Sequence, residues 1–306
     1  MNGLMMEATS TRIYDYEKVC GSIGSGFPKQ YSIAKRVTIK DQGDKGACVA
    51  CALCSCAEYI WDKEMSEGFS YGMFRDESHK TPGLYMSKAL DYAKNIGFVP
   101  YDDFGVLEEM PNIRTLVKKY PDLKDIASNY RISGYTNLLY GNKEKRDNAI
   151  KDAIMKGIGV PAVSDDYFNE SHAIMLTGWD DDKDAYEFQN SWGTNFGDNG
   201  VDYIPKNEIT AVYAILVTPI KLPFKDVPEN AWYYNDVKNQ YLAGYVNGTS
   251  DTTFEPERFI TRAEYCAANN RNCKADDENH ARIFKVINSL VDRIVVLEEK
   301  LKELKR

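Results

Sequence analysis

Four residues, in the order glutamine, cysteine, histidine and asparagine, are the types that nucleophilic catalysis by a thiol requires. Gln42 and Cys48 lie in the run DQGDKGACVA, His172 lies in SHAIML, and Asn190 lies in QNSWGTNFG. A cysteine attacks a carbonyl group as the thiolate, so it needs a base, a group that orients the base, and donors for the oxyanion. We therefore expect Cys48 to be the nucleophile and His172 the base. Asn190 would orient the base, and Gln42 would donate to the oxyanion.

The segments around these residues predict the elements that position them. The run VACALCSCAEYIW after Cys48 is apolar and rich in small residues, which indicates a buried helix with the thiol at its N-terminus. The positive end of a helix dipole lowers a thiol pKa, so we expect the thiolate to be favoured. HAIMLTGW indicates a strand that begins at His172, and YEFQNSWG indicates a second strand and a turn that present Asn190.

This pattern resembles the papain-like cysteine peptidases over roughly the first 220 residues. Gly46, Ala47 and Cys48 fit the family pattern C-G-[SA]-C-[WY]. Lys45 stands where the family has a cysteine, and Val49 stands where it has an aromatic residue. The spacing from the cysteine to the later histidine and asparagine is close to the ~130 to 150 residues of the family.

The resemblance implies an α+β, papain-like two-lobed fold, with a helical lobe and a β lobe, for residues 1–220. It also implies a protein or peptide substrate. Trp192 would cover the hydrogen bond between His172 and Asn190 from water. An alternative stays open, because the same residues can persist in a catalytically silent scaffold, and the departures at Lys45 and Val49 are compatible with that.

Two clusters suggest metal sites, and neither has the required spacing. Cys48, Cys51, Cys54 and Cys56 form C-x2-C-x2-C-x-C, which begins like an iron–sulfur ligand run but lacks its final C-x3-C-P spacing. The acidic residues between 180 and 184 lack the glycine and the distant glutamate of a calcium loop. We therefore expect no metal and no other cofactor, and we expect the acidic segment to be a solvated hairpin turn.

Composition limits the partners and the location. The chain has 306 residues, 43% of them hydrophobic, which is enough for a core of ordinary size and for appended modules. Its formal net charge of -8 argues against a nucleic-acid partner. No window of about 18 apolar residues predicts a membrane span. Residues 1–18 lack an apolar secretory core, so we expect synthesis in the bacterial cytoplasm without a signal peptide.

A second resemblance begins after residue 220. Residues 221–272 resemble one S-layer-homology motif, a small helical module of a family that binds anionic cell-wall polysaccharide. Trp232 and Arg262 match the positions for that ligand, since a guanidinium pairs with carboxylates and a Trp face packs on a sugar ring. The family works as three tandem repeats and this chain has one, so a folded spacer without a ligand stays open as the alternative. The matching residues are Phe224, Asp226, Val227, Trp232, Tyr233, Gly244, Asn247, Gly248, Phe254, Pro256, Thr261, Arg262, Ala263 and Glu264.

Residues 273–306 predict a coiled-coil helix. Apolar residues there alternate steps of four and three, which is the spacing of a heptad stripe. The stripe consists of Ile283, Ile287, Leu290, Ile294, Leu297, Leu301 and Leu304. We therefore expect a homo-oligomer, either a dimer or a trimer.

Together these features predict a cysteine endopeptidase tethered to the bacterial cell wall or carried on a phage particle. A virion or cell-surface location would reconcile a wall-binding motif with the missing signal peptide. The alternative is a silent scaffold or wall-binding structural protein that oligomerises through its C-terminal helix.

Overall fold

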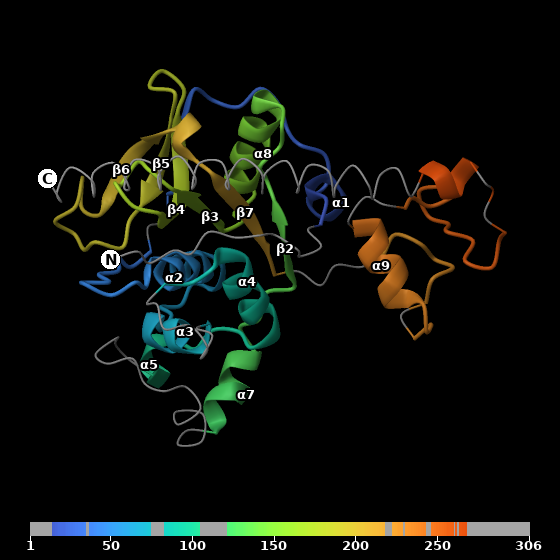
Figure 1. Cartoon of the computed structure of the whole chain (residues 1–306), viewed down its shortest axis with the longest axis horizontal. Coiled ribbons are helices and arrows are strands. Elements are labelled where there is room, and N and C mark those ends of the chain that lie inside the picture. The colour runs from blue at the N-terminus through green and yellow to red at the C-terminus, as the bar shows by residue number, and fades with distance from the viewer. Residues whose placement is uncertain are drawn as a thin grey trace, which may run out of the picture. The chain divides into compact units, whose positions relative to one another are not determined.

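The computed structural model describes residues 14–34, 37–74, 83–104, 121–217, 222–228, 230–242, 246–259, 261 and 263–267. They fall into two compact units, the first within Ile13–Ile220 and the second within Lys221–Arg306. Figure 1 shows the elements of both units with their labels.

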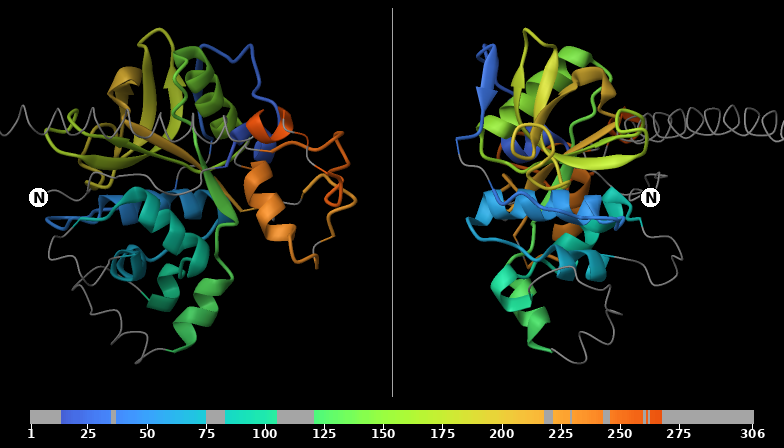
Figure 2. Two further views of the ribbon diagram at one scale, coloured as in Figure 1. Left: turned by 45° about the vertical axis from the view of Figure 1, so that its right-hand side comes forward. Right: turned by 90° about the vertical axis from the view of Figure 1, so that its left-hand side faces the viewer.

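The helical layer of the first unit is built around one buried helix. That helix, α2, spans Cys48–Trp61, and its first eleven residues are all buried. Small side chains allow close packing: a Cβ added at Gly159 would lie 2.7 Å from the Cβ of Cys56. The other helices of this layer are α3 (Glu67–Phe74), α4 (Met86–Asn95), α5 (Tyr101–Phe104) and α7 (Asp122–Ser128). Both views of Figure 2 place these helices on one side of the sheet.

The second layer is an antiparallel sheet of seven strands. Its main path runs β2-β7-β3-β4-β5-β6, and β1 pairs with β4 outside that path. The strands are β1 (Gln30–Ser32), β2 (Gly134–Asn137), β3 (Val160–Ser164), β4 (His172–Asp180), β5 (Ala185–Gln189), β6 (Val201–Pro205) and β7 (Ala211–Leu216). A short 3-10 helix, η1 (Lys206–Glu208), joins β6 to β7.

Strand β4 is the centre of the sheet, and all nine of its residues are buried. Its first half pairs with β3, from Ser164↔His172 to Val160↔Leu176, and its second half pairs with β1. Helix α8 (Lys143–Met155) lies across the sheet from α2 in Figure 1, and the N-terminal helix α1 spans Tyr16–Cys20. A strand buried on both faces holds its side chains in fixed positions. The structure thus contains the two expected elements: β4 begins at His172, and α2 begins at Cys48.

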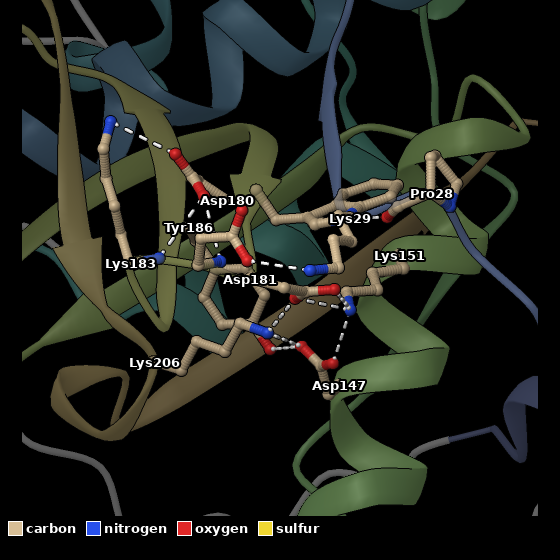
Figure 3. Close-up of polar contacts among 11 residues, drawn as sticks. Pro28, Lys29, Asp147, Lys151, Asp180, Asp181, Lys183, Tyr186 and Lys206 are labelled. Carbon is tan, nitrogen blue, oxygen red and sulfur yellow. Dashed lines mark hydrogen bonds and ion pairs between the residues drawn. The ribbon is translucent and has the colours of Figure 1, made fainter.

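The acidic segment forms the hairpin turn between β4 and β5 that the sequence predicts, and residues 182–184 are exposed, but two lysines anchor its first residue, Asp181. Lys151 Nζ lies 2.8 Å from Asp181 Oδ1 and 2.8 Å from Asp147 Oδ2, and its side chain is only 6% exposed. Lys206 Nζ contacts the same two carboxylates, at 2.7 Å and 2.9 Å (Figure 3). Asp180 is also buried. Ion pairs from α8 and from η1 therefore anchor the start of this turn, because partners far away in the sequence fold against it.

The second unit has a small described core formed by Phe224, Val227 and Tyr234. Helix α9 spans Tyr234–Leu242. Asp226 accepts backbone hydrogen bonds from Phe254 and Glu255, at 2.9 Å and 2.6 Å, which ties the two halves of the module together.

The TRAE sequence of this unit forms a capping box. The Thr261 hydroxyl accepts from the Glu264 N–H at 3.2 Å, and Glu264 Oε2 accepts from the Thr261 N–H at 2.8 Å. Two expectations, the role of Arg262 and the coiled coil over 273–306, lie outside the described residues.

Two expected absences concern only the part of the chain that the structure describes. Within it, no helix is long and apolar enough to cross a membrane. The same part holds no group of three or more His, Cys, Asp or Glu residues arranged to bind a metal ion.

Candidate active site

Cys48 is the first residue of α2, at the end of the loop that carries Gln42. The N-cap residue, Ala47, makes no side-chain capping hydrogen bond. No side-chain cap therefore uses the first backbone N–H groups of the helix. The backbone amides of Ala173, Val49 and Cys48 itself lie close enough to the sulfur to act to lower the thiol pKa. Ala173 follows His172 on β4, so the packing of α2 on this strand brings the thiol close to the residue after the histidine.

The charge state of the thiol differs from the sequence expectation. Burial raises the pKa of the Cys48 thiol to about 11, although the amides of Ala173 and Val49 act to lower it. Burial also lowers the pKa of His172, while the hydrogen bond to Asn190 acts in the opposite direction. Burial therefore disfavours the charged form of both groups, because removing a charge from water costs more than the local donors return.

His172 and Asn190 meet as the sequence predicts. His172 Nε2 donates to Asn190 Oδ1 at 2.7 Å, and both residues are buried. The Ser191 N–H also donates to Asn190 Oδ1, at 2.8 Å, and the Asn190 N–H donates to the Gly200 carbonyl at 2.9 Å. Asn190 is thus fixed by its backbone and its side chain. Its contact with Nε2 leaves Nδ1 as the imidazole nitrogen that can accept a proton.

Trp192 lies against the imidazole, as the resemblance implies. The ring centroids of His172 and Trp192 are 4.6 Å apart and their planes are tilted by 37°. The next residue, Gly193, has φ +72, and a Cβ there would lie 2.9 Å from Asp41 Oδ2. Its N–H donates to the Lys40 carbonyl at 3.0 Å. Gly193 therefore allows the backbone turn that follows Trp192 and helps to position the indole.

Gln42 is buried and its side-chain amide is fixed at both ends. Its Oε1 accepts from the Ser191 hydroxyl at 2.6 Å, and its Nε2 donates to the Lys45 carbonyl at 2.8 Å. A primary amide carries two N–H groups, so one remains to be offered to an oxyanion. The backbone N–H of Gln42 donates to the Ser191 carbonyl at 2.9 Å, which joins this loop to the strand that presents Asn190.

Two features of the site escaped the sequence analysis. One is the buried cation Lys40, whose Nζ lies 2.5 Å from Glu58 and 3.4 Å from Glu67. A signal was available, since Glu58 is the single charged residue in the small-residue helix α2, and a buried carboxylate needs a partner. The other is Phe168, whose ring lies 4.8 Å from that of His172. No spacing rule reaches it, because it lies in the loop between β3 and β4.

The arrangement provides the parts for acyl transfer. A buried imidazole of fixed tautomer begins β4, a thiol at the N-terminus of α2 packs on that strand, and a primary amide lies in the loop that leads to the thiol. Donors of this type stabilise the charge that develops on a carbonyl oxygen under attack.

Comparison with solved structures identifies the fold of the first unit. Xylellain, a cysteine protease from Xylella fastidiosa, superposes with a TM-score of 0.56 at 19% identity, over 71% of this chain and 96% of that chain. Procathepsin L2 from the Tenebrio molitor larval midgut gives a TM-score of 0.56 at 20% identity, over 70% and 78% of the two chains. The first unit has the papain-like cysteine protease fold. At these identities the likeness concerns the fold.

Sequence relatives point the same way. A cysteine protease from Blomia tropicalis is 23% identical over 222 residues, which is 61% of this chain and 62% of that protein. The chain thus matches less than two thirds of that relative's length. Residues 223–266 match the S-layer homology domain. Papain-like protease relatives and an S-layer homology domain are therefore both shown for this chain.

Of the two wall-binding candidates, Trp232 can be placed and Arg262 cannot. Trp232 is 88% exposed on the second unit, and its ring lies 5.4 Å from that of Tyr233 in an edge contact. Arg262 lies outside the described residues.

Proposed function

We propose that the chain is a cysteine endopeptidase that cleaves peptide bonds in protein or peptide substrates through Cys48, His172 and Asn190. The 2.7 Å hydrogen bond between His172 Nε2 and Asn190 Oδ1 carries the proposal. It fixes the histidine on strand β4, whose next residue, Ala173, lies close enough to the Cys48 sulfur for its backbone amide to lower the thiol pKa. The protease fold of the first unit supports it further.

In this mechanism the Cys48 sulfur attacks the substrate carbonyl carbon while its proton passes to His172 Nδ1. Gln42 Nε2 and the Cys48 N–H stabilise the resulting oxyanion. The C–N bond then breaks, and the imidazolium gives its proton to the leaving amine. A water molecule, deprotonated by His172, hydrolyses the thioester and regenerates the thiol.

The proposal is tested with a peptidyl epoxide, which needs both a substrate cleft and a reactive thiol. Cys266 is exposed and Cys20 is half-buried, whereas Cys48 is fully buried. A small alkylating agent would therefore report which thiol is accessible and not which thiol is catalytic. We expect the epoxide to modify Cys48 first, as mapped by mass spectrometry of the digested protein.

His172→Ala is the matched control, because it removes the base and keeps the thiol. We expect it to abolish modification of Cys48 and cleavage of peptides, while modification of Cys266 by iodoacetamide continues. Equal labelling of Cys48 with and without His172 would reject the endopeptidase and favour the silent scaffold.

We also propose that the second unit attaches the enzyme to anionic cell-wall polysaccharide through Trp232 and Arg262. The S-layer homology match suggests association with the cell surface, and an indole that is 88% exposed is available to a sugar ring. We expect Trp232→Ala to reduce cosedimentation with purified cell walls. Phe259→Ala is the control, since Phe259 is 95% exposed in the same unit but is not among the residues that carry the resemblance to the motif. Equal loss in both variants would reject a specific role for Trp232.

Homo-oligomerisation through residues 273–306, and carriage on a phage particle, remain part of the proposal. Three chains would present three wall-binding motifs, so avidity would replace tandem repeats. Detection of the protein in purified virions by mass spectrometry would support carriage, and its absence from them would reject it.

A further inference from the structure

The loop between β3 and β4 places an aromatic ring beside the imidazole on which the proposed function rests. The ring centroid of Phe168 is 4.8 Å from that of His172 and 5.4 Å from that of Trp192. With the 4.6 Å between His172 and Trp192, the three rings form a compact triangle. Phe168 also makes an edge contact with Phe188 of β5, at 5.7 Å.

Local hydrogen bonds hold this loop in shape. Asn169, directly after Phe168, has φ +60, a left-handed conformation that Asn tolerates better than most residues. Its N–H donates to the Asp166 carbonyl at 2.9 Å, and the Ser171 hydroxyl donates to Asp165 Oδ1 at 2.9 Å. The position of the Phe168 ring is therefore set by its own loop as well as by the rings it touches.

We propose that Phe168 is a positioning residue: with Trp192, its ring encloses the hydrogen bond between His172 and Asn190, excludes water from it and keeps the imidazole in one tautomer. Water competes for exposed hydrogen bonds, whereas a bond between buried partners keeps more of its strength. Trp192 covers one side of the imidazole, and Phe168, at nearly a right angle to the indole, covers another.

The charged neighbours of His172 do not account for its lowered pKa. Burial is the largest effect on the pKa of His172 and lowers it, whereas Glu170, in the same loop, acts to raise it. The Cys48 thiol of α2, the proposed proton donor, has its own pKa raised by burial. The apolar enclosure is therefore the feature to test.

The test measures His172 directly in the Cys48→Ala background, where no peptide cleavage is needed. The full-length chain has three histidines, so the imidazole signals can be followed by NMR during a pH titration and assigned by His172→Gln. We expect Phe168→Ala to raise the pKa of His172 towards its ordinary value, because water reaches the ring. The nitrogen shifts should then report a mixture of tautomers. Phe168→Leu keeps an apolar side chain, so it should change the pKa and the tautomer of His172 less than Phe168→Ala does.

Phe196→Leu is the matched control, since Phe196 packs on Trp192 and Phe188, at 5.3 Å and 6.0 Å. We expect it to lower thermal stability comparably while leaving the pKa and the tautomer of His172 at their wild-type values. An unchanged or lowered pKa in Phe168→Ala, or an equal shift in Phe196→Leu, would overturn the role of Phe168.

Kinetics separate this inference from the proposed function. In the chain with Cys48 intact, we expect Phe168→Ala to lower kcat by roughly 10-fold, part of the ~10²–10⁴ that a well-placed general base contributes. The acid limb of its pH profile should move in the same direction as the pKa measured by NMR. If the wild-type chain cleaves no peptide, the endopeptidase proposal fails, and the NMR result still decides the role of Phe168.

Discussion

Burial decides the charges of the two groups that would exchange a proton. The sequence predicts a thiol at a helix N-terminus, and α2 begins at Cys48 as expected. Sequence reasoning assigned the helix dipole the main effect on the thiol pKa, but burial depends on the whole fold and outweighs it. Burial thus acts against the charged form of both groups, and in the proposed mechanism the proton moves when the substrate is bound.

A ground state with both groups neutral predicts a specific dependence of kcat/KM on pH. Only neutral imidazole accepts the thiol proton, so activity should fall as pH drops through the pKa of His172. Burial places that pKa below 6.5, and the acid limb should lie there too. The plateau should extend beyond pH 9, because the thiol pKa is raised to about 11. An acid limb at about pH 4, in the range of preformed thiolate–imidazolium pairs, would contradict the neutral ground state.

The hydrogen bonds of Gln42 predict a graded pair of variants. Gln42→Ala removes the Nε2 donor, and loss of one oxyanion donor lowers kcat on the order of 100-fold or more. Ser191→Ala removes the hydroxyl that donates to Gln42 Oε1 at 2.6 Å but keeps the Nε2 donor. We expect a smaller loss for Ser191→Ala, measured with the same peptide substrate. An unchanged kcat in Gln42→Ala would show that its amide does not face the oxyanion.

Elements that carry the site follow from local patterns, whereas the links between them do not. The small-residue run predicts α2, and the apolar run beginning at His172 predicts β4. Asn190 directly follows β5, as its segment indicates. The ion pairs of Asp147 with Lys206 and of Lys40 with Glu58 join residues far apart in the chain. Their partners depend on the packing of helices and strands, which no single-sequence spacing rule specifies.

Lys40 connects the loop that carries Gln42 to two helices. Its Nζ lies 2.5 Å from Glu58 of α2 and donates to the Met65 carbonyl at 3.2 Å, and its side chain is 2% exposed. Although burial acts to lower its pKa, the neighbouring carboxylates, chiefly Glu58, raise it, so this lysine is charged. The charge is thus paired chiefly with the buried carboxylate of Glu58.

Removing the lysine should therefore destabilise the fold strongly. Lys40→Met leaves the Glu58 carboxylate buried without its cation, which typically costs about 3 to 5 kcal/mol. We expect that loss in the free energy of unfolding from urea titration. Glu64→Gln is the control, because Glu64 is 42% exposed and contacts Lys40 at 3.4 Å, so its loss should be below about 1 kcal/mol. An equal loss of unfolding free energy in the two variants would contradict a special role for the buried pair of Lys40 and Glu58.

At the scale of the whole molecule, two units of different character share one chain. The first has an extensive buried core that includes α2 and most of the sheet. The described core of the second has three buried hydrophobic residues, while Trp232 and Phe259 are exposed. Small modules bury a small fraction of their surface and commonly depend on association for stability. The sequence motif located this module, but its exposed aromatic rings are visible only in three dimensions.

Assembly through residues 273–306 gives the last prediction. We expect the full-length chain to sediment as a homo-oligomer at micromolar concentration. A version that ends before Lys274 should sediment as a monomer, still cleave peptides and bind cell walls more weakly through lost avidity. Each apolar side chain buried in a heptad stripe contributes roughly 1.5 to 3 kcal/mol, but an isolated helix of this length is marginal. Association should therefore weaken steeply when stripe residues are made polar.

Two double variants separate the stripe from the length of the tail. Leu290→Asn with Leu297→Asn alters the stripe, whereas Asp292→Asn with Glu299→Gln alters positions outside it. We expect only the first pair to give monomers, with peptide cleavage retained in both. A monomeric wild-type chain would reject assembly. Unchanged wall binding by the monomeric stripe variant would reject only the avidity proposal, because a single module would then be sufficient for binding. Neither result bears on the peptidase site.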